Sequence, residues 1–581
     1  MPRPPIAFAL ATFSAAATGQ SAAEVEQQRL ETLFAQQMSG CTMTGRFTVD
    51  DDATAPQTDR YTLGDVRKIR DEKWRVEAKI EYGEKSATVP LMVDVFWAGE
   101  TPMIQVSDLA VPTLGVYSAR VLIDGDRYAG TWSGKRHGGQ MFGRIDSAPE
   151  EQDPKGNWPS WRGNEGTGEA PGAKPPVTWS EDENVVWKTP LPGLGNSTPV
   201  IWGDRIFLTT AVETEEKREA QPGADDSDSR GRRDRRRGRR GGGAALTNYY
   251  DFRVLAIDRN SGEVIWSKSA ARAVPHERGH KTGSQASNSP VTDGRFVYAH
   301  FGSRGIHCFT LDGEPVWSRT DLGQMRTRNQ FGEGSSPALV DDTLLVNWDH
   351  EGDSYLLALD ARNGKDKWKQ PRNEPTSWST PVVVEVGRKK QVIVNATKAS
   401  RAYDLETGKV IWSCEGMTAN TIPTPIVRDG VAYLMSGFRG AMLQAIRLEG
   451  AKGDITDSEH VLWTHERQTS YVPSALLLDD SIFFLRSNSA VLSCVDAETG
   501  EVRYEGQRLA GLRTIYASPV AADGRIYLTS REGVTKVIKA GDKYEELATN
   551  ELDDAFDASP ILIGDRIYLR GHDNLYCLGK K

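Results

Sequence analysis

The 581-residue chain carries 71 Lys and Arg against 80 Asp and Glu, a net charge of −9 that argues against a general nucleic-acid binder. Its length predicts more than one domain. Glycine (56 residues) and tryptophan (15 residues) are abundant, which suits turn-rich strands that pack on flat aromatic rings.

The N-terminus has the pattern of a secretory signal peptide over residues 1–23. Arg3 supplies a short basic region, residues 6–17 are apolar, and Ser21-x-Ala23 fits a small-residue cleavage site. The alternative is an ordinary disordered N-terminus. The apolar stretch is too short to span a bilayer, and no later segment is long and apolar enough. We therefore expect a periplasmic or otherwise exported protein without a transmembrane segment.

Residues 24–147 predict a small N-terminal β-domain. Glu24–Gln37 reads as a short amphipathic helix, and nine strands of alternating polarity follow it. We expect a meandering antiparallel, barrel-like sheet, whose closing segment over 128–143 is similar to the last hairpin of lipocalin- or avidin-type barrels. Residues 148–157 then form a polar linker. The predicted strands are Gly45–Val49, Arg60–Ile69, Lys73–Tyr82, Ser86–Pro90, Asp94–Trp97, Met103–Leu109, Tyr117–Ile123, Asp126–Trp132 and Gly139–Ile145.

A recurring motif over residues 158–581 predicts a β-propeller. The motif Ala-x-Asp-x-x-x-Gly-Lys-x-x-Trp spans 358–368 and 402–412, with a near copy over 256–266. Each copy follows a Ser/Thr-Pro step and an alternating apolar run, and the steps recur about every 40–50 residues, as propeller blades do. Weaker versions of the motif end at Trp317, Trp463 and Tyr504.

Each repeat reads as four short strands joined by Asn-Gly and Asp-Gly type turns. Because one four-stranded sheet cannot bury both of its faces, the units must stack, and radial stacking gives a propeller. The eighth unit has only three strands, and Val185–Lys188 is predicted to supply its fourth strand and close the ring. The eight units begin at Thr198, Ser289, Ser336, Thr380, Thr424, Pro473, Ser518 and Ser559.

An arginine-rich insert interrupts the first blade over residues 213–244. It lacks large apolar residues and is predicted to be a disordered loop. Such a tract could bind RNA, anionic lipid or polysaccharide, or it could simply be solvated. No aromatic residue is interleaved before Tyr249, so the stacking contacts of single-strand recognition are missing. We therefore expect no nucleic-acid partner.

The metal-binding and redox signals of the sequence are weak. Five cysteines are scattered singly, so neither a disulfide framework nor a zinc site is indicated. His276-x-x-x-His280, with Glu277 between them, lies in a predicted loop, and solvated histidines are the alternative to a metal pair. No phosphate-binding or dinucleotide-binding fingerprint is present. No metal and no catalytic residue are assigned.

One set of positions is predicted to converge on the ring axis. The residue two positions before each blade start should approach the axis on one face of the ring, and aromatic and polar groups would meet there with Glu333 and Arg513 nearby. This could form a ligand-binding funnel, or the aromatic residues could simply pack at the tops of the blades. The converging residues are Asn196, Ser287, Gly334, Trp378, Ile422, Tyr471, Tyr516 and Asp557.

The motif resembles the tryptophan-docking repeat of quinoprotein (PQQ) dehydrogenases and the repeat of BamB-like assembly lipoproteins, over Trp158 to Lys581. In quinoprotein dehydrogenases the resemblance implies an axial calcium ion held by carboxylate and amide oxygens, an Asp base, and an adjacent Cys pair. This chain has no adjacent Cys pair, and Glu333, Asn347 and Asp349 are the nearest approach to the ligand set. No cofactor is expected, with PQQ and calcium as the alternative.

Three functional hypotheses follow from these observations. The first is an exported, non-enzymatic propeller scaffold that binds another macromolecule of the cell envelope, as BamB-like proteins imply. The second is a PQQ- and calcium-dependent dehydrogenase of alcohols or sugars. The third is a polysaccharide-binding envelope protein whose funnel aromatics stack on sugars. The sequence leaves the oligomeric state open.

Overall fold

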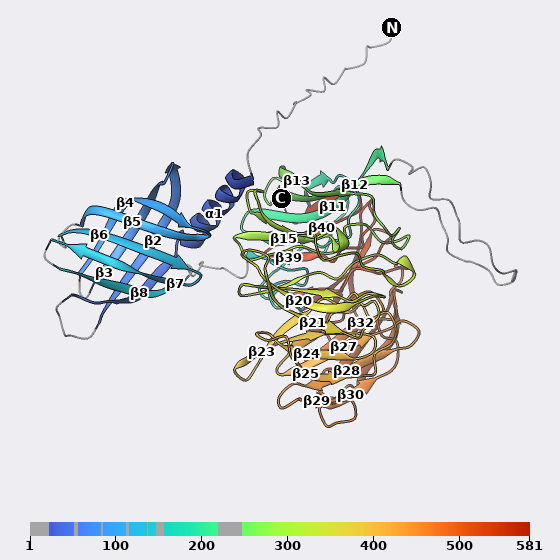
Figure 1. Cartoon of the computed structure of the whole chain (residues 1–581). Coiled ribbons are helices and arrows are strands. Elements are labelled where there is room, and N and C mark those ends of the chain that lie inside the picture. Colours follow the sequence, from blue (N-terminus) through green and yellow to red (C-terminus); the bar gives the residue numbers. More distant parts are fainter. Residues whose placement is uncertain are drawn as a thin grey trace, which may run out of the picture. The chain divides into compact units, whose positions relative to one another are not determined.

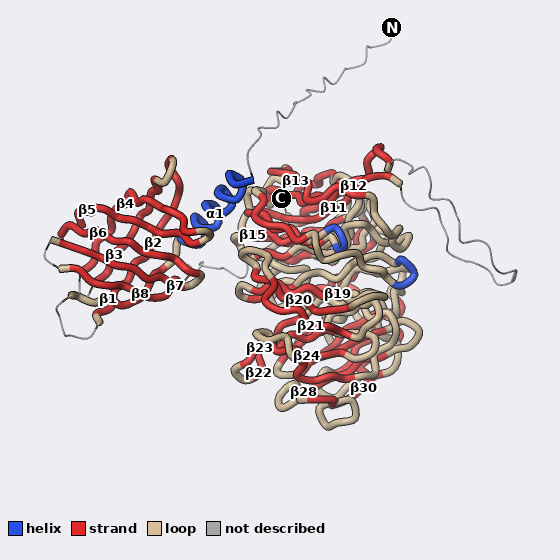
Figure 2. The backbone as a smooth tube through the Cα atoms, viewed as in Figure 1, coloured by secondary structure: helices blue, strands red, loops and turns tan. Residues whose placement is uncertain are grey.

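The computed structural model describes residues 22–50, 56–82, 85–111, 115–135, 137–146, 156–218 and 247–580. The predicted signal peptide and linker fall almost entirely outside these residues. The chain divides into two compact units, Met1–Gln152 and Asp153–Lys581, and both are built of strands (Figures 1 and 2). No helix among the described residues is long and apolar enough to cross a membrane.

The first unit is a closed eight-stranded barrel preceded by one helix, α1 (Ala22–Met38). The strands follow one another around the barrel, and β1 closes it by pairing with β8. Phe34 of α1 packs edge-on against Trp74 at 5.1 Å and Trp97 at 6.1 Å, so the helix contributes to the barrel core. The strands are β1 (Thr42–Phe47), β2 (Gln57–Arg70), β3 (Lys73–Tyr82), β4 (Lys85–Ala98), β5 (Thr101–Val111), β6 (Gly115–Asp124), β7 (Arg127–Gly134) and β8 (Gly138–Asp146).

The predicted barrel-like domain is confirmed, but the prediction of nine strands is wrong. Ser86–Pro90 and Asp94–Trp97 are parts of the single strand β4. The ladder between β3 and β4 continues without a break through Pro90, which lies opposite Glu77. A proline can occupy a ladder position where its missing N–H is not needed, so Pro90 does not end the strand.

The second unit is an eight-bladed propeller, as predicted (Figure 1). Six blades are built from four strands consecutive in the chain, blade 5 skips β29, and the last blade recruits β9 (Val185–Pro190). Blade 1 comprises β10 (Val200–Trp202), β11 (Arg205–Lys217), β12 (Asn248–Asp258) and β13 (Val264–Ala273), and blade 2 comprises β14 (Val291–Thr292), β15 (Phe296–His300), β16 (Ile306–Thr310) and β17 (Pro315–Arg319). Blade 3 comprises β18 (Ala338–Val340), β19 (Thr343–Trp348), β20 (Ser354–Asp360) and β21 (Asp366–Arg372). Blade 4 comprises β22 (Val382–Val386), β23 (Lys389–Val394), β24 (Ser400–Asp404) and β25 (Val410–Cys414), with β29 (Gly453–Asp454) added in parallel to β25.

Two short 3-10 turns, Gly302–Arg304 and Arg328–Gln330, lie in loops of the second unit. Blades 5 to 8 are built in the same way as blades 1 to 4. These blades comprise β26 (Ile426–Arg428), β27 (Val431–Ser436), β28 (Met442–Arg447) and β30 (Val461–His465); β31 (Leu476–Leu478), β32 (Ser481–Leu485), β33 (Val491–Asp496) and β34 (Val502–Arg508); β35 (Val520–Ala522), β36 (Arg525–Thr529), β37 (Val534–Lys539) and β38 (Glu546–Glu551); and β39 (Ile561–Ile563), β40 (Arg566–Arg570) and β41 (Asn574–Leu578), with β9 as the fourth strand.

Closure of the ring by the strand before blade 1 is confirmed. β9 pairs antiparallel with β41, and Trp187 lies opposite Cys577. Trp187 also packs near Tyr568 of β40, at 6.1 Å between ring centroids. The first and last parts of the propeller are thus joined by an ordinary backbone ladder.

The motif glycine explains why the tryptophan recurs. Gly408 has φ +69°, a left-handed conformation that glycine adopts without strain. A Cβ at Gly408 would lie 2.6 Å from the ring of Trp368 in the preceding blade. The indole N–H of Trp368 donates to the carbonyl of Leu405 at 2.8 Å. The turn of one blade therefore forms a flat seat for the tryptophan of the blade before it. The same pairing joins Trp187 to Gly262, Trp266 to Gly313, Trp317 to Gly364 and Trp463 to Gly500.

The predicted start of the arginine-rich insert is wrong by several residues. β11 continues to Lys217, which pairs with Asn248 of β12. Thr214 donates its hydroxyl to the carbonyl of Tyr249 at 2.9 Å, and Asn248 donates to Glu213 at 2.7 Å. These long-range bonds hold the polar C-terminal part of β11 as a strand, although its own sequence has no alternating apolar pattern that would predict one. Residues 219–246 lie outside the described part.

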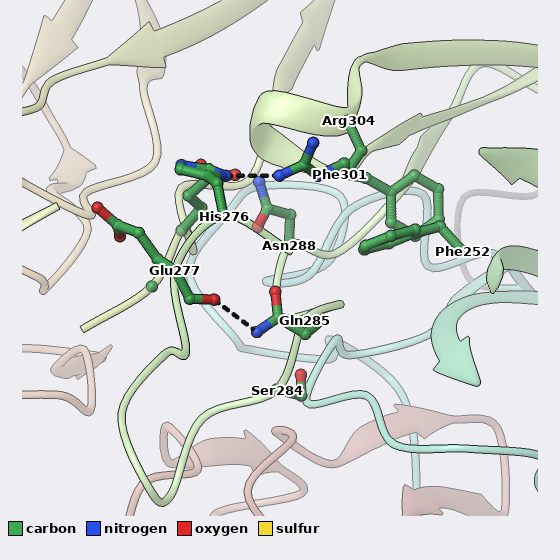
Figure 3. Close-up of a pocket in the computed structure, with 10 residues that line it drawn as sticks. Phe252, His276, Glu277, Ser284, Gln285, Asn288, Phe301 and Arg304 are labelled. Atoms are coloured by element: carbon green, nitrogen blue, oxygen red, sulfur yellow. Dashed lines mark hydrogen bonds and ion pairs between the residues drawn. The ribbon is translucent and has the colours of Figure 1, made fainter. Parts of the chain in front are cut away.

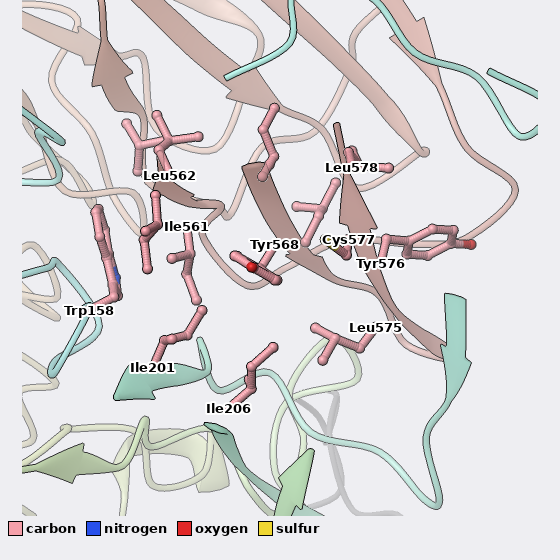
Figure 4. Close-up of a cluster of buried hydrophobic side chains, with 14 of the residues drawn as sticks. Trp158, Ile201, Ile206, Ile561, Leu562, Tyr568, Leu575, Tyr576, Cys577 and Leu578 are labelled. Carbon is pink, nitrogen blue, oxygen red and sulfur yellow. The ribbon is translucent and has the colours of Figure 1, made fainter. Parts of the chain in front are cut away.

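A segment over residues 156–184 crosses the ring before β9. Trp158 exchanges backbone hydrogen bonds with Ile201 at 2.8 Å, and Ala170 donates to the carbonyl of Ala521 at 2.8 Å. Trp158 points into the apolar cluster that also holds Ile561 (Figure 4). We call residues 156–184 the crossing segment.

Arg162 of the crossing segment is fully buried and bonds to blades 6 and 7. Its guanidinium donates to the carbonyls of Pro519 at 3.0 Å and Ala475 at 2.7 Å, and also to Thr167. Burial lowers the pKa of Arg162 to about 9, because no carboxylate compensates the lost hydration. Carbonyl oxygens alone therefore satisfy this cation.

Candidate functional site

The Ser/Thr residues at the blade starts form a ring around the axis, which we call the hydroxyl belt. The backbone N–H of Thr198 donates to the hydroxyl of Ser289 at 2.9 Å, and Ser289 donates in the same way to Ser336 at 2.9 Å. The same bond runs from Thr424 through Ser474 and Ser518 to Ser559, and the N–H of Ser559 donates to the hydroxyl of Thr198 at 3.0 Å. A small side chain with one oxygen therefore suits the blade starts that these bonds join. The belt consists of Thr198, Ser289, Ser336, Thr380, Thr424, Ser474, Ser518 and Ser559.

The predicted sixth start needs a correction of one residue. We expected Pro473, but Ser474 is the residue that takes the belt position. Its hydroxyl accepts the N–H of Thr424 at 3.0 Å, and its own N–H donates to Ser518 at 2.9 Å. Here the proline precedes the hydroxyl residue, whereas in the other seven units it follows. The bonding pattern depends on the hydroxyl, and the proline is not part of it.

The belt opens into a cavity of about 420 Å³. All eight positions that the sequence analysis placed on the axis line this cavity, and Glu333 lines it as well. The predicted convergence is therefore present, and ligand binding there stays a prediction. These residues are Asn196, Ser287, Gly334, Trp378, Ile422, Tyr471, Tyr516 and Asp557.

Aromatic side chains cover much of the cavity wall. Tyr471 stacks on Phe438 at 4.7 Å with an interplanar angle of 26°. The indole N–H of Trp378 donates to the carbonyl of Gly332 at 2.7 Å, which fixes the orientation of the ring. The guanidinium of Arg531 lies 5.4 Å from the centre of the Tyr516 ring. Each ring is held by a contact behind or beside it, so the aromatic surface is preorganised.

The polar wall of the cavity centres on Asp557. One oxygen of this carboxylate, Oδ2, lies 3.2 Å from Arg531 and 2.9 Å from His572. The other, Oδ1, is buried and has no hydrogen-bond partner within the described protein. The side-chain oxygen of Asn196 is also buried without a hydrogen-bond partner in the described protein, while its amide N–H donates to the carbonyl of Thr282 at 3.2 Å. Two hydrogen-bond acceptors of the cavity wall therefore lack partners.

One imidazole also lines the cavity. His280 bonds through Nδ1 to the hydroxyl of Thr282 at 2.6 Å and packs edge-on against Phe331 at 5.2 Å. Burial lowers the pKa of His280, and the neighbouring cations Lys281 and Arg531 add to the effect. The ring is therefore neutral at neutral pH.

Trp161 of the crossing segment lines the cavity together with all the belt residues. The residues that follow the belt in blades 1 and 2, at Ile201 and Thr292, bond to Trp158 and Pro159. The crossing segment thus lies beyond the belt, and Trp161 closes that end of the cavity. The cavity opens toward the blade-top loops and is blind at the other end.

Glu333 is held from several sides. Its carboxylate accepts the N–H of Ser303 at 2.6 Å and also bonds to the Ser303 hydroxyl. His276 lies 3.6 Å from Glu333 and bonds through its other ring nitrogen to Arg304 at 2.5 Å. Figure 3 shows His276 and Arg304 in a second, smaller pocket, which Glu333 also lines. Burial raises the pKa of Glu333. Its oxygens are therefore committed to protein donors.

Asp349, a second residue of the expected calcium-ligand set, is committed within the protein. It forms a fully buried, two-point ion pair with Arg372, at 2.8 and 2.9 Å, and accepts the hydroxyl of Ser377 at 2.7 Å. The amide N–H groups of Asn347 donate to Ser377 and to the carbonyl of Ser379, while its side-chain oxygen is buried without a hydrogen-bond partner in the described protein. A cation beside Asp349 would meet the guanidinium of Arg372. These residues do not fit an axial calcium ion that would hold a quinone.

The histidine pair and the cysteines have separate surroundings. His276 and His280 bond to different partners, Met325 and Thr282. Across the described residues, no three His, Cys, Asp or Glu side chains are grouped closely enough to hold a metal ion. The five cysteines are all buried as free thiols in the two cores, and burial raises the pKa of Cys414 to about 11. They behave as small apolar residues.

Several cavity residues were missed by sequence reasoning. Trp161, Phe331, Phe438 and His280 line the cavity but lie outside the repeat, in the crossing segment or in loops of unequal length. The symmetry rule that found the other positions carries no information about them. Arg531, which follows the second strand of blade 7 and contacts the cavity residues Asp557 and Tyr516, was missed for the same reason.

The fold and the blade contacts define an eight-bladed propeller with tryptophan-docked blades and an axial cavity. The chain belongs to the family described as outer membrane protein assembly factor BamB, which it matches over residues 251–505 and 402–581, together more than half of its length. Over 148 residues it is 26% identical to the lanthanide-dependent methanol dehydrogenase of Methylorubrum extorquens, a match that covers 23% of each protein.

A similar fold is found among solved structures. A europium-containing methanol dehydrogenase superposes with a TM-score of 0.51 at 10% identity, covering 74% of this chain and 99% of that one. BamB from Moraxella catarrhalis gives a TM-score of 0.42 at 14% identity, covering 56% of this chain and 93% of that one. At these identities the likeness concerns the fold alone.

Proposed function

We propose that this protein is a non-enzymatic binding scaffold of the bacterial cell envelope, which holds a protein partner on the face of the ring where the axial cavity opens. The observation that carries the proposal is membership of the family named for the assembly factor BamB. The name implies work on other proteins at the envelope, and it agrees with the secretory pattern of residues 1–23.

The charge at the cavity mouth supports an acidic partner surface. Lys281 and Arg439 are exposed, and each directly follows a residue that lines the cavity, His280 and Phe438. The net charge of the whole chain is −9, so these two cations at the cavity mouth are opposite in sign to the charge of the chain as a whole. Complementary charges of this kind speed association and set orientation.

The alternative function is a quinone- and calcium-dependent dehydrogenase, favoured by the similarity to methanol dehydrogenase. The protein donors and the Arg372 guanidinium that hold Glu333 and Asp349 argue against it. The direct check is reduction of a redox dye by purified protein with PQQ, calcium and a panel of alcohols and aldoses. Activity that disappears in Glu333→Gln would replace the scaffold proposal with the enzyme.

Photo-crosslinking from defined positions tests the binding face. Arg439 is replaced by a photoreactive amino acid, with Lys409 as the matched control. Lys409 is an exposed cation in the turn before β25. The first strand of each blade runs away from the cavity, so this turn lies on the opposite face. One envelope protein captured from Arg439 and not from Lys409 is expected. Equal labelling from both positions would refute the proposed face.

A further inference from the structure

The cavity interior combines features that a surface for protein binding alone does not need. Six aromatic side chains from the crossing segment and several blades line the cavity, and each is partly exposed: Trp161, Phe331, Trp378, Phe438, Tyr471 and Tyr516. The volume of about 420 Å³ falls in the range of small-molecule pockets, roughly 300–1,000 Å³. The space is therefore large enough for a compact ligand.

The unpaired acceptors specify what such a ligand must offer. Oδ1 of Asp557 belongs to a side chain that is only 3% exposed, and it has no hydrogen-bond partner in the described protein. Oδ1 of Asn196, in the neighbouring blade, is also buried without one. A buried acceptor without a donor costs about 1–3 kcal/mol. Both residues line the cavity, so a ligand that brings hydroxyl or amide donors would supply the missing partners once the side chains turn these oxygens toward it.

The charges of the site argue against a strongly ionic ligand. Asp557 is balanced by Arg531 and His572 at 3.2 and 2.9 Å. An anionic ligand would meet the Asp557 carboxylate, and a cationic ligand would find this carboxylate already paired with Arg531. A purely apolar ligand would leave both acceptors without donors. What remains is a neutral molecule with apolar faces and several donors.

We propose that the axial cavity binds a neutral carbohydrate. The C–H faces of a sugar ring suit the aromatic walls, and its hydroxyl groups suit the acceptors of Asp557 and Asn196. Because Trp161 closes the cavity at the belt, a polymer cannot thread through the ring. The site therefore takes the terminal sugar residues of a glycan. This site lies inside the cavity and does not depend on the proposed protein partner.

The test begins with the full-length purified protein on an array of neutral glycans ending in glucose, galactose, mannose or N-acetylglucosamine. The best-bound glycan is then titrated calorimetrically as its disaccharide and its tetrasaccharide. Equal affinity per mole for the two lengths is expected, because only the chain end enters. Tighter binding in proportion to length would refute capture of the chain end.

Matched variants locate the binding. Tyr516→Ala removes an aromatic wall and should weaken the affinity at least about tenfold, equivalent to about 1.4 kcal/mol. Asn196→Ala removes one acceptor and should also weaken it. Tyr544→Ala is the control, since Tyr544 belongs to the same blade but lies in the turn before β38, away from the cavity.

Unchanged affinity in both cavity variants would place the sugar elsewhere and overturn the proposal. So would the absence of binding to every glycan of the array, or saturable binding of PQQ in place of sugar. None of these results bears on the crosslinking from Arg439, so failure of this proposal and failure of the proposed function are distinguishable.

Discussion

Docking of tryptophan on the motif glycine can be measured with two alanine substitutions in neighbouring blades. Gly408 and Gly430 have nearly the same backbone conformation, φ +69° and +75°. A Cβ at Gly430 would meet nothing within 4 Å, whereas a Cβ at Gly408 would lie 2.6 Å from the Trp368 ring. Both substitutions pay the left-handed penalty of about 1–2 kcal/mol. Only Gly408→Ala must also displace the tryptophan.

The additional cost at Gly408 follows from the contacts of Trp368. Displacing the ring loosens the indole hydrogen bond to Leu405, worth about 0.5–1.5 kcal/mol, and forces a packing change worth about 1–3 kcal/mol. We expect Gly408→Ala to lower the free energy of unfolding by about 2 kcal/mol more than Gly430→Ala does.

Equilibrium urea unfolding, followed by circular dichroism and tryptophan fluorescence, measures this difference. Trp368→Phe in the Gly408→Ala background should recover part of the loss, because the smaller ring leaves room for the methyl group. Equal unfolding midpoints for the two alanine variants would show that the glycine serves only the turn, and the docking interpretation would be wrong.

Three more predictions concern the ring and its buried charges. Deleting residues 1–190, which removes β9, should greatly lower the melting temperature of the propeller, whereas deleting residues 1–155 should not; equal melting of both would count against closure by β9. Asp349→Ala leaves Arg372 buried without its partner and should cost about 3–5 kcal/mol in denaturant unfolding, more than replacing both residues by apolar ones. Burial lowers the pKa of His300 to about 4 from an ordinary 6.5, so on acidification the unfolded protein binds a proton at this residue before the folded protein does. The contribution of neutral His300 to the free energy of unfolding is therefore complete above pH 6.5 and falls by about 3 kcal/mol as the pH drops to 4. In His300→Gln, the free energy of unfolding should decrease by about 3 kcal/mol less between pH 6.5 and pH 4 than in the original protein. An unchanged pH profile would show that His300 does not cause this decrease.

The repeated part of the fold was predictable because each blade carries its own instructions. The turn glycine, the docking tryptophan and the Ser/Thr-Pro step are local signals, and they recur at a fixed period. Counting strands also revealed that blade 8 needed Val185–Lys188. The axial positions followed from symmetry alone, which is why Trp378 and Tyr516 were placed correctly on the cavity wall.

What the sequence did not reveal depends on contacts between distant, unrepeated segments. Trp161 reaches the axis only because the crossing segment bonds to blades 1, 2, 7 and 8. The polar extension of β11 to Lys217 exists because β12 pairs with it, not because of any apolar pattern. At blade 6, a proline one residue early concealed that Ser474 carries the belt hydrogen bonds. In each case the deciding partner lies far away in the chain.

The pairing of β9 with β41 also governs the order of events during biosynthesis. β9 is made before every blade, whereas its partner strand β41 is made after the strands of all the other blades. Until β41 is available the ladder edge of β9 is open, and such an edge recruits other strands. The ring therefore reaches its final state only after β41 has been made, and contacts of this sequence separation form slowly. Conditions that withhold β41, such as truncation before Asn574, should release aggregating material even though most blades are intact.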